Sequence, residues 1–120
     1  MMAPTLVLDG DRPRLVIGSA GSVRLSGAIL QVIAAVVGHG LPVRAAIERP
    51  RLHNEEGVLH LEGGWEDDAA ERLEADGWEV MRWSGQNLYF GGVSGVETRP
   101  DDTLGAAGDP RRGGHGIVVE

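Results

Sequence analysis

The sequence predicts a mixed α/β (α+β) fold, and two observations support this prediction. Short runs rich in Val, Leu and Ile lie between glycine, proline and aspartate residues, which predicts strands and turns. One long apolar segment and one charged amphipathic segment have helical spacing. A chain of 120 residues buries only about 60–68% of its unfolded surface. We therefore expect residues 1–120 to form one domain or part of one.

The elements are expected to alternate along the chain. Residues 5–9 and 14–17 flank a glycine and a proline, which predicts a β-hairpin. A helix is expected over residues 23–37, ending at Gly38 or Gly40. Its apolar residues extend nearly all round, which predicts burial on more than one side. The remaining expectations are a helix over 42–47, a strand over 58–62, a charged helix over 66–75, a strand over 78–83, a strand over 88–97 broken by Gly91-Gly92, a turn at 99–102, and closing strands near 104–107 and 117–119.

Composition excludes several classes of function. The formal net charge of −7 argues against a nucleic-acid partner, which would require a basic surface. The absence of cysteine excludes disulfides, thiolate metal sites and a cysteine nucleophile. No apolar run approaches the ~20 residues of a membrane span, and no signal peptide opens the chain. All eleven basic residues are arginine, which suggests a GC-rich bacterial genome.

The turn at residues 18–22 is the most informative segment. The apolar run 15–17 enters it, and the long apolar helix follows directly. Such a turn directs unpaired backbone N–H groups, reinforced by the helix dipole, toward an anion or the oxyanion of an acyl-transfer reaction. The alternative is a plain strand-to-helix connection that uses glycine only for its tolerance of positive φ.

Several segments, in order, resemble the small subunit of the γ-glutamyltranspeptidases. These segments are residues 3–8, 16–25, 29–33, 46–53, 87–93 and 108–114. Together they extend over essentially the whole chain. The resemblance implies an N-terminal-nucleophile hydrolase with an αββα core, of which this chain would form a partial sandwich.

The resemblance also implies an activity and a site. In the family, a threonine freed by self-cleavage attacks the γ-carbonyl of glutathione or a similar γ-glutamyl compound, and its own amine acts as base. The acyl group then passes to water or to an amino-acid or peptide acceptor, and no cofactor or metal is implied. The two backbone N–H donors of the oxyanion hole correspond to Gly21 and Ser22. Ser22 replaces a glycine but keeps its N–H, and its side chain is expected to cap the helix.

Two departures concern the rest of the catalytic machinery. The nucleophilic threonine and nearby substrate-binding residues of the family lie upstream of Pro4-Thr5, so we expect no nucleophile among Thr5, Thr98 and Thr103. The family's Ser-Ser-Met motif would end at Met2, with Met1 at the second serine. The true N-terminus is therefore expected to be missing, which leaves the compartment open between bacterial cytoplasm and periplasm or secretion. We expect the chain alone to be inactive.

Other candidates have a functional and a structural interpretation. Arg24 could approach a substrate carboxylate or tie down a neighbouring loop. His53 is expected to pack or hydrogen-bond, since the histidines lack metal-ligand spacing. Residues 109–114 predict a turn salt-bridged to the body of the protein rather than a basic partner surface.

Two hypotheses for the whole chain remain. One is the C-terminal portion of a γ-glutamyltransferase-like enzyme, whose partners are a γ-glutamyl small molecule and the remainder of the enzyme. The other is a free-standing, non-catalytic α/β interaction module or gene remnant. Because the missing strands would leave an open edge and an apolar face, we expect the isolated chain to be marginally stable or to self-associate.

Overall fold

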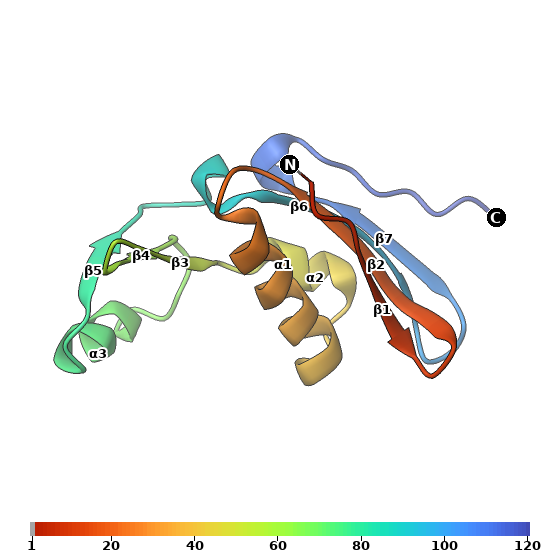
Figure 1. The fold of residues 1–120 in the computed structure, drawn as a ribbon, viewed down its shortest axis with the longest axis horizontal. Helices are drawn as coiled ribbons and strands as arrows, with labels where there is room; N and C mark the ends of the chain where they lie inside the picture. The colour runs from red at the N-terminus through yellow and green to blue at the C-terminus, as the bar shows by residue number, and fades with distance from the viewer. Residues whose placement is uncertain (1) are drawn as a thin grey trace.

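Two sheets lie one beside the other along an elongated molecule of 47 × 24 × 22 Å (Figure 1). The computed structural model describes residues 2–120, so Met1, which the resemblance aligns with a serine, lies outside the described residues. The fold is mixed α/β, as predicted. Its strands divide between a four-stranded and a three-stranded sheet.

The larger sheet has the order β1-β2-β6-β7 and is antiparallel throughout. Its strands are β1 (Thr5–Asp9), β2 (Arg12–Ala20), β6 (Gly92–Thr98) and β7 (Leu104–Gly108). The predicted hairpin is confirmed as β1 and β2. Strand β2 is longer than predicted because Pro13 still lies opposite Leu8, beside a bulge at Val7/Leu8.

Helices cover only one face of this sheet. They are α1 (Leu25–Ile33), its π-helical continuation η1 (Ala34–Gly38) and α2 (Val43–Glu48). Ile29, Val32 and Ile47 pack with the inward-facing side chains of β2 and β6 to form the main core. The prediction that the first helix is buried on more than one side is wrong in this chain. Leu30 is 67% exposed, since none of the elements within residues 2–120 covers the far side of α1.

The smaller sheet is formed by the part of the chain between α2 and β6, both of which belong to the larger sheet and its helices. It contains β3 (Leu52–Glu55), β4 (Val58–Leu61) and β5 (Glu79–Arg82), with α3 (Ala69–Ala75) packed on one face. Strands β4 and β5 are parallel, and α3 is their crossover. The strand β3 was not predicted, and α3 begins at Ala69 rather than at residue 66, since the acidic residues before it form a turn.

The C-terminal strand expected at residues 117–119 is absent from the structure of residues 2–120. After the 3-10 turn η3 (Pro110–Arg112), the chain runs back along β7 without pairing with it. A Cβ added at Gly116 would lie 2.3 Å from the carbonyl carbon of Ala106. The tail therefore lies flat on the backbone of β7, where it cannot extend the ladder.

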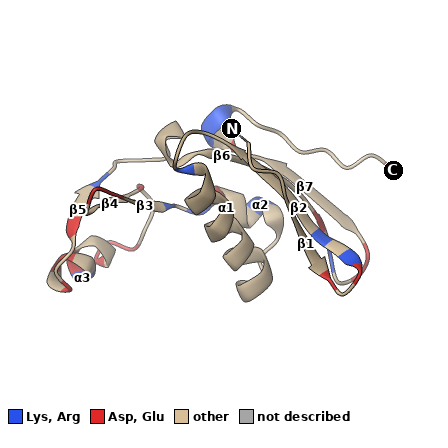
Figure 2. Cartoon of the chain, in the orientation of Figure 1, with Lys and Arg blue, Asp and Glu red and all other residues tan. Residues whose placement is uncertain are grey.

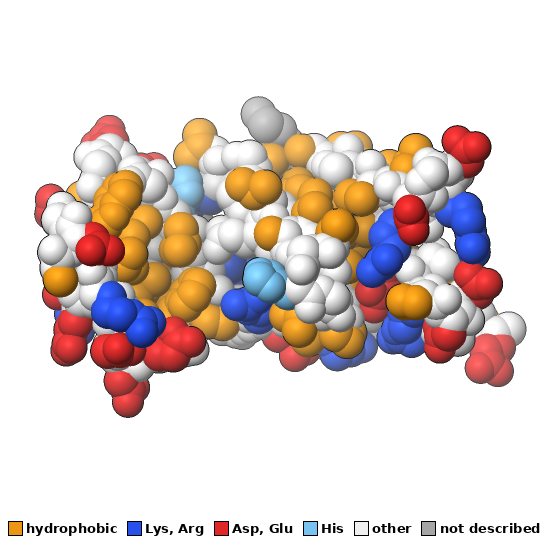
Figure 3. Space-filling model, turned by 90° about the horizontal axis from the view of Figure 1, so that it is seen from below, with side chains coloured by type: hydrophobic (Ala, Val, Ile, Leu, Met, Phe, Trp, Pro, Cys, Tyr) orange, Lys and Arg blue, Asp and Glu red, His pale blue; other side chains and the backbone are white. Residues whose placement is uncertain are grey.

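The outer face of the larger sheet is open and apolar. Val16 is 50% exposed and Val96 is 44% exposed, and Leu6 and Leu104 are also exposed. Charged residues concentrate at the two ends of the molecule (Figure 2), and the helical face shows hydrophobic patches between them (Figure 3). None of the helices in residues 2–120 is both long and apolar enough to cross a bilayer.

Candidate functional site

The turn between β2 and α1 has the geometry that the sequence predicted. Gly21 has φ +140, a conformation that favours glycine, and α1 begins four residues later at Leu25. Within residues 2–120, neither the Gly21 N–H nor the Ser22 N–H donates a backbone hydrogen bond. A turn before α1 is closed by Leu25 N–H, which donates to the Ser22 carbonyl at 3.3 Å, and Ala28 N–H then donates to the Arg24 carbonyl at 3.1 Å. Two adjacent amides therefore remain available near the N-terminus of a helix.

The role predicted for the Ser22 side chain is wrong. The residue that caps α1 is Arg24, and no side-chain hydrogen bond caps this helix. Ser22 is two residues too early to serve, because residues 23 and 24 form a turn before the helix begins. Any contribution of Ser22 to the site must therefore come from its backbone N–H, not from its hydroxyl.

A second glycine turn approaches the first one closely. The 3-10 turn η2 (Leu88–Phe90) ends at Gly91, which has φ +85, and β6 then begins at Gly92 opposite Ala20. A Cβ added at Gly21 would lie 3.6 Å from the Gly91 Cα, and one added at Gly91 would lie 3.2 Å from the Ala28 Cβ. The Gly91-Gly92 interruption seen in the sequence is thus the point where the two turns meet.

Arg24 ties the first turn of α1 to both neighbours. Its Nε donates to the Tyr89 carbonyl at 2.6 Å, and its guanidinium carbon lies 4.2 Å from the centre of the Tyr89 ring. One of its terminal nitrogens is 3.8 Å from a Glu55 carboxylate oxygen. Of the two interpretations left open by the sequence, the structure shows the loop-fixing one.

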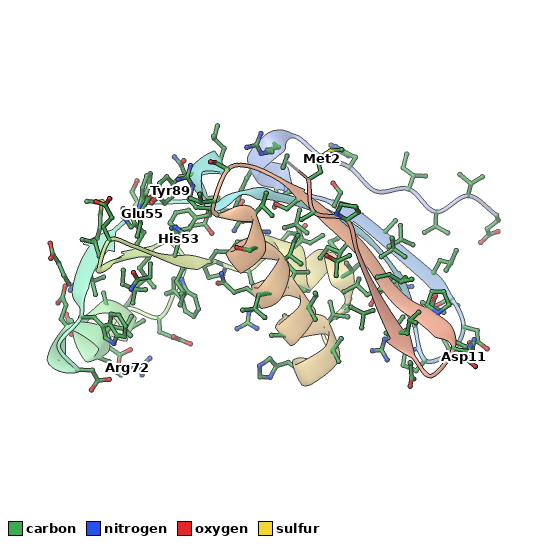
Figure 4. The ribbon with its side chains drawn as sticks, viewed as in Figure 1. Met2, Asp11, His53, Glu55, Arg72 and Tyr89 are labelled. Atoms are coloured by element: carbon green, nitrogen blue, oxygen red, sulfur yellow. The ribbon has the colours of Figure 1, made fainter. Side chains whose placement is uncertain are left out.

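Tyr89, Glu55 and His53 form a cluster between η2 and β3 (Figure 4). The Tyr89 hydroxyl donates to Glu55 at 2.6 Å. Burial and this hydrogen bond raise the pKa of Tyr89, and the same hydrogen bond lowers the pKa of Glu55. His53 lies edge-on to Tyr89, with ring centres 6.2 Å apart, and burial lowers its pKa. His53 therefore packs in this cluster, as its structural interpretation predicted.

A buried ionic network lies beneath η3. The sequence predicted a salt-bridged turn here but did not indicate that its charged side chains are buried. Arg111 and Glu62 form a pair whose side chains are both 0% exposed, and Arg51 donates to Asp109 at 2.7 Å. Asp109 also accepts from the Val93 and Arg111 backbone N–H groups. Burial alone would raise the pKa of Asp109, but the Arg51 charge and these hydrogen bonds lower it. The predicted salt-bridged turn is confirmed, as an interior feature instead of a surface one.

An open cleft of about 430 Å³ lies on the outer face of the larger sheet, at the end where β2 enters the turn. Residues from three segments line it: Met2 and Pro4 before β1, Ala20, Gly92 and Ser94 on β2 and β6, and Arg112 in η3. The Ser19 N–H donates to the Met2 carbonyl at 3.0 Å, which fixes the N-terminal segment over the sheet. The cleft and the two free amides are thus next to each other along β2.

None of the three threonines lies close to the turn at Gly21 and Ser22. Thr98 is at the opposite end of β6 from Gly92, and Thr103 lies beyond it and donates to Asp101. Thr5 is paired with Ile17, and its hydroxyl donates to the Ala3 carbonyl at 3.1 Å. None of the three is therefore placed as a nucleophile for a carbonyl bound at Gly21 and Ser22.

Comparison with known proteins identifies first the class and then the family. A γ-glutamyltranspeptidase of Pseudomonas nitroreducens, solved in complex with L-DON, superposes with a TM-score of 0.83 and 27% identity over 99% of this chain and 62% of that one. The fold is thus that of the N-terminal-nucleophile hydrolases. The family model for gamma-glutamyltranspeptidase matches residues 1–119. The chain belongs to the γ-glutamyltranspeptidase family.

Curated relatives include both acylases and glutathione hydrolases. The chain is 31% identical to the acylase ACY 1 proenzyme of Pseudomonas sp. (strain SE83) over 98% of its own length and 21% of that protein. It is 32% identical to the glutathione hydrolase proenzyme of Escherichia coli (strain K12) over 92% of its own length and 19% of that protein. The chain therefore spans about a fifth of the length of these relatives.

Proposed function

We propose that this chain is the C-terminal portion of a γ-glutamyltransferase-like hydrolase that cleaves γ-glutamyl amides such as glutathione and transfers the γ-glutamyl group to water, amino acids or peptides. The observation that supports this most directly is the pair of uncommitted amides at Gly21 and Ser22. They lie in a turn fixed by Arg24, within a chain that matches the family over nearly its whole length.

The two amides would stabilise the tetrahedral intermediate. Attack on the substrate carbonyl places negative charge on its oxygen, and preorganised backbone donors typically lower such a barrier by about 3–4 kcal/mol. Gly21 supplies the conformation that presents the amides, and the helix dipole of α1 adds to the positive potential. The nucleophilic threonine and its amine would come from the remainder of the enzyme, so the chain alone would be inactive.

A chimera tests this proposal. The C-terminal fifth of the E. coli glutathione hydrolase would be replaced by this chain, and hydrolysis of γ-glutamyl-p-nitroanilide would be measured after self-cleavage. We expect turnover by the chimera and none by the isolated chain. Ser22→Pro removes one donor N–H and should lower kcat by about 10²–10³-fold. Ser22→Ala keeps the N–H and is the matched control, with a kcat close to that of the unchanged chimera.

Two outcomes would contradict the proposal. Steady turnover by the isolated chain, surviving repurification, would mean that a nucleophile lies within these residues. A self-cleaved chimera whose kcat is unaffected by Ser22→Pro would remove the amides from the reaction. If the chimera cleaves itself but has no γ-glutamyl activity, the free-standing, non-catalytic module becomes the better account.

A further inference from the structure

The smaller sheet carries a group of packed rings on the face away from α3. His53 on β3 and His60 on β4 are paired across the strands, so their side chains share this face. The Trp83 indole donates to the His60 Nδ1 at 3.2 Å, and its ring stacks on that of Tyr89 with centres 4.8 Å apart. The His60 and Tyr89 ring centres are 5.0 Å apart. The Tyr89 ring is therefore fixed against the sheet by two partners.

Glu55, on β3, fixes the hydroxyl end of the Tyr89 side chain (Figure 4). The hydroxyl donates to the Glu55 carboxylate at 2.6 Å. The backbone of Tyr89 is held as well, because its N–H donates to the Asn87 side chain at 2.9 Å, which caps the turn η2. With its ring, its hydroxyl and its N–H all engaged, Tyr89 has one well-defined position, from which its carbonyl can hold another element.

Arg24 attaches the start of α1 to that carbonyl. Its Nε donates to the Tyr89 carbonyl at 2.6 Å, and its guanidinium also lies over the Tyr89 ring, 4.2 Å from the ring centre. The Glu55 carboxylate lies 3.8 Å from one of its terminal nitrogens. Since no side-chain hydrogen bond caps α1, these contacts hold its N-terminus, and with it the Ser22 amide two residues earlier.

Gly91 gives Tyr89 a second connection to the same turn. The Gly91 N–H donates to the Leu88 carbonyl at 3.2 Å, so Gly91 is fixed to η2. A Cβ added at Gly21 would lie 3.6 Å from the Gly91 Cα, which is ordinary van der Waals contact. Tyr89 thus fixes the turn from two sides, through Arg24 at the helix and through Gly91 at the strand.

We propose that Arg24 and Tyr89 are positioning residues for the amides at Gly21 and Ser22, and that the smaller sheet supports them through Glu55. This inference rests on the proposed function, because the amides matter to a reaction only if a carbonyl is processed there. Preorganised donors lower a barrier because they need not reorient as charge develops on the oxygen. A displacement of about 1 Å can cost about 10²-fold in rate, so a support outside the larger sheet can affect the chemical step.

Backbone relaxation of the labelled 120-residue chain tests the positioning without catalysis. Nuclear magnetic resonance order parameters would be measured for the Gly21 and Ser22 N–H groups. We expect rigid values of about 0.85 in the unchanged chain and values below about 0.6 in Arg24→Met, which keeps the length of the side chain but loses its donors. Arg44→Met, at an exposed arginine of α2, is the matched control and should leave both amides rigid.

Variants at Glu55 test the support while leaving Arg24 in place. Glu55→Ala removes the acceptor of the Tyr89 hydroxyl and should lower the same two order parameters by a smaller amount. Glu55→Gln keeps an oxygen acceptor and should restore them. Glu56→Ala, at the next and exposed carboxylate, is the control and should have no effect. If Arg24→Met does not fold, these variants at the surface of the smaller sheet decide.

Kinetics of the chimera then connect the positioning to the reaction. Arg24→Met should lower kcat for γ-glutamyl-p-nitroanilide by about 10–100-fold and change KM by less than about twofold, since the amides act on the tetrahedral intermediate. The inhibition constant of a γ-glutamyl boronate analogue, whose adduct with the nucleophile is tetrahedral, should rise by a similar factor. Partial unfolding lowers the amount of active enzyme but leaves this constant unchanged, so the rise reports on positioning.

The outcomes separate this inference from the proposed function. The inference is overturned if Arg24→Met and Glu55→Ala leave the two order parameters and the boronate constant unchanged, or if Glu55→Gln behaves as Glu55→Ala does. An active chimera with either result would reject the inference alone. A self-cleaved chimera without turnover, whose isolated chain still has rigid amides that Arg24→Met loosens, would reject the proposed function alone.

Discussion

Arg111 and Arg112 are adjacent in the sequence but lie in opposite environments. The Arg111 side chain is fully buried, and its nitrogens donate to Glu62, Asp109 and the carbonyls of Ile47 and Arg49. Arg112 is exposed and lines the open cleft, and it has no such partner within residues 2–120. Both residues belong to the 3-10 turn η3, in which consecutive side chains point in different directions, so Arg111 is buried while Arg112 is exposed.

The difference indicates what each region does. Burial alone would lower the pKa of Arg111, but its hydrogen bonds with Glu62 and the nearby carboxylates raise it. A fully paired interior cation of this kind fixes the position of η3, α2 and the smaller sheet relative to one another. An exposed cation without such partners contributes little to that arrangement.

The largest expected effect is on folding. Arg111→Ala leaves Glu62 and part of Asp109 buried without their cation, which should lower the free energy of unfolding by about 3–5 kcal/mol. Arg112→Ala should change it by no more than about 0.5 kcal/mol. Urea unfolding followed by tryptophan fluorescence measures both. Equal losses would show that the two arginines do not differ as described.

A second comparison is between the two faces of the larger sheet. If the open face drives self-association, Leu6→Glu with Val96→Lys should raise the dimer dissociation constant by at least about tenfold, with little loss of stability. Light scattering over a range of concentrations measures this. Leu30→Glu, on the exposed side of α1, is the control. A monomeric unchanged chain, or dispersal by Leu30→Glu alone, would contradict this prediction.

Acid should weaken the buried network specifically. The pKa of Asp109 is lower in the folded chain than its ordinary value, so the folded state binds fewer protons in that range. Its stabilisation is present above the unfolded pKa of about 3.9 and is lost as the pH falls through the folded pKa. We expect unfolding free energies measured in urea to decline below about pH 4. The decline should be smaller in Asp109→Asn, and an identical pH dependence in both proteins would exclude this role.

The smallest expected effect concerns Tyr89, the single tyrosine of the chain. Its ultraviolet titration should give a pKa above about 10, because burial and the Glu55 hydrogen bond favour the neutral form. Glu55→Gln should bring this pKa closer to the ordinary value. Glu56→Gln changes the next, exposed carboxylate and should leave the titration unaltered. A titration that ignores Glu55→Gln would argue against the hydrogen bond.

The sequence predicted local elements well and long-range partners poorly. The hairpin of β1 and β2 and the turn at Gly21 follow from glycine, proline and apolar spacing within a few residues. The strand β3 was missed because Leu52–Glu55 is short and polar, and becomes a strand only by pairing with β4. No local pattern shows that Glu62 and Arg111, 49 residues apart, will be buried together.

The candidate site likewise has a part that the local sequence predicted and a part that depends on contacts between distant segments. The turn at residues 18–22 was found from its position between a strand and a helix, which is a local signal, and the resemblance to the family then indicated Gly21 and Ser22 within it. The partnership of Arg24, Tyr89 and Glu55 was missed because it joins three elements that are far apart in the chain. Arg112 was placed in a salt-bridged turn, and the structure shows that only its neighbour is bridged.

The smaller sheet has a consequence for anyone who wishes to trim this protein. The chain departs at Arg51 and rejoins at Phe90, and Arg51 donates to the Phe90 carbonyl at 3.1 Å, so a brief linker could bridge the gap. Such a deletion would also remove Glu62 and leave the buried Arg111 guanidinium without this carboxylate partner. A minimal version should therefore tolerate the excision only when Arg111 is exchanged for an uncharged residue such as methionine.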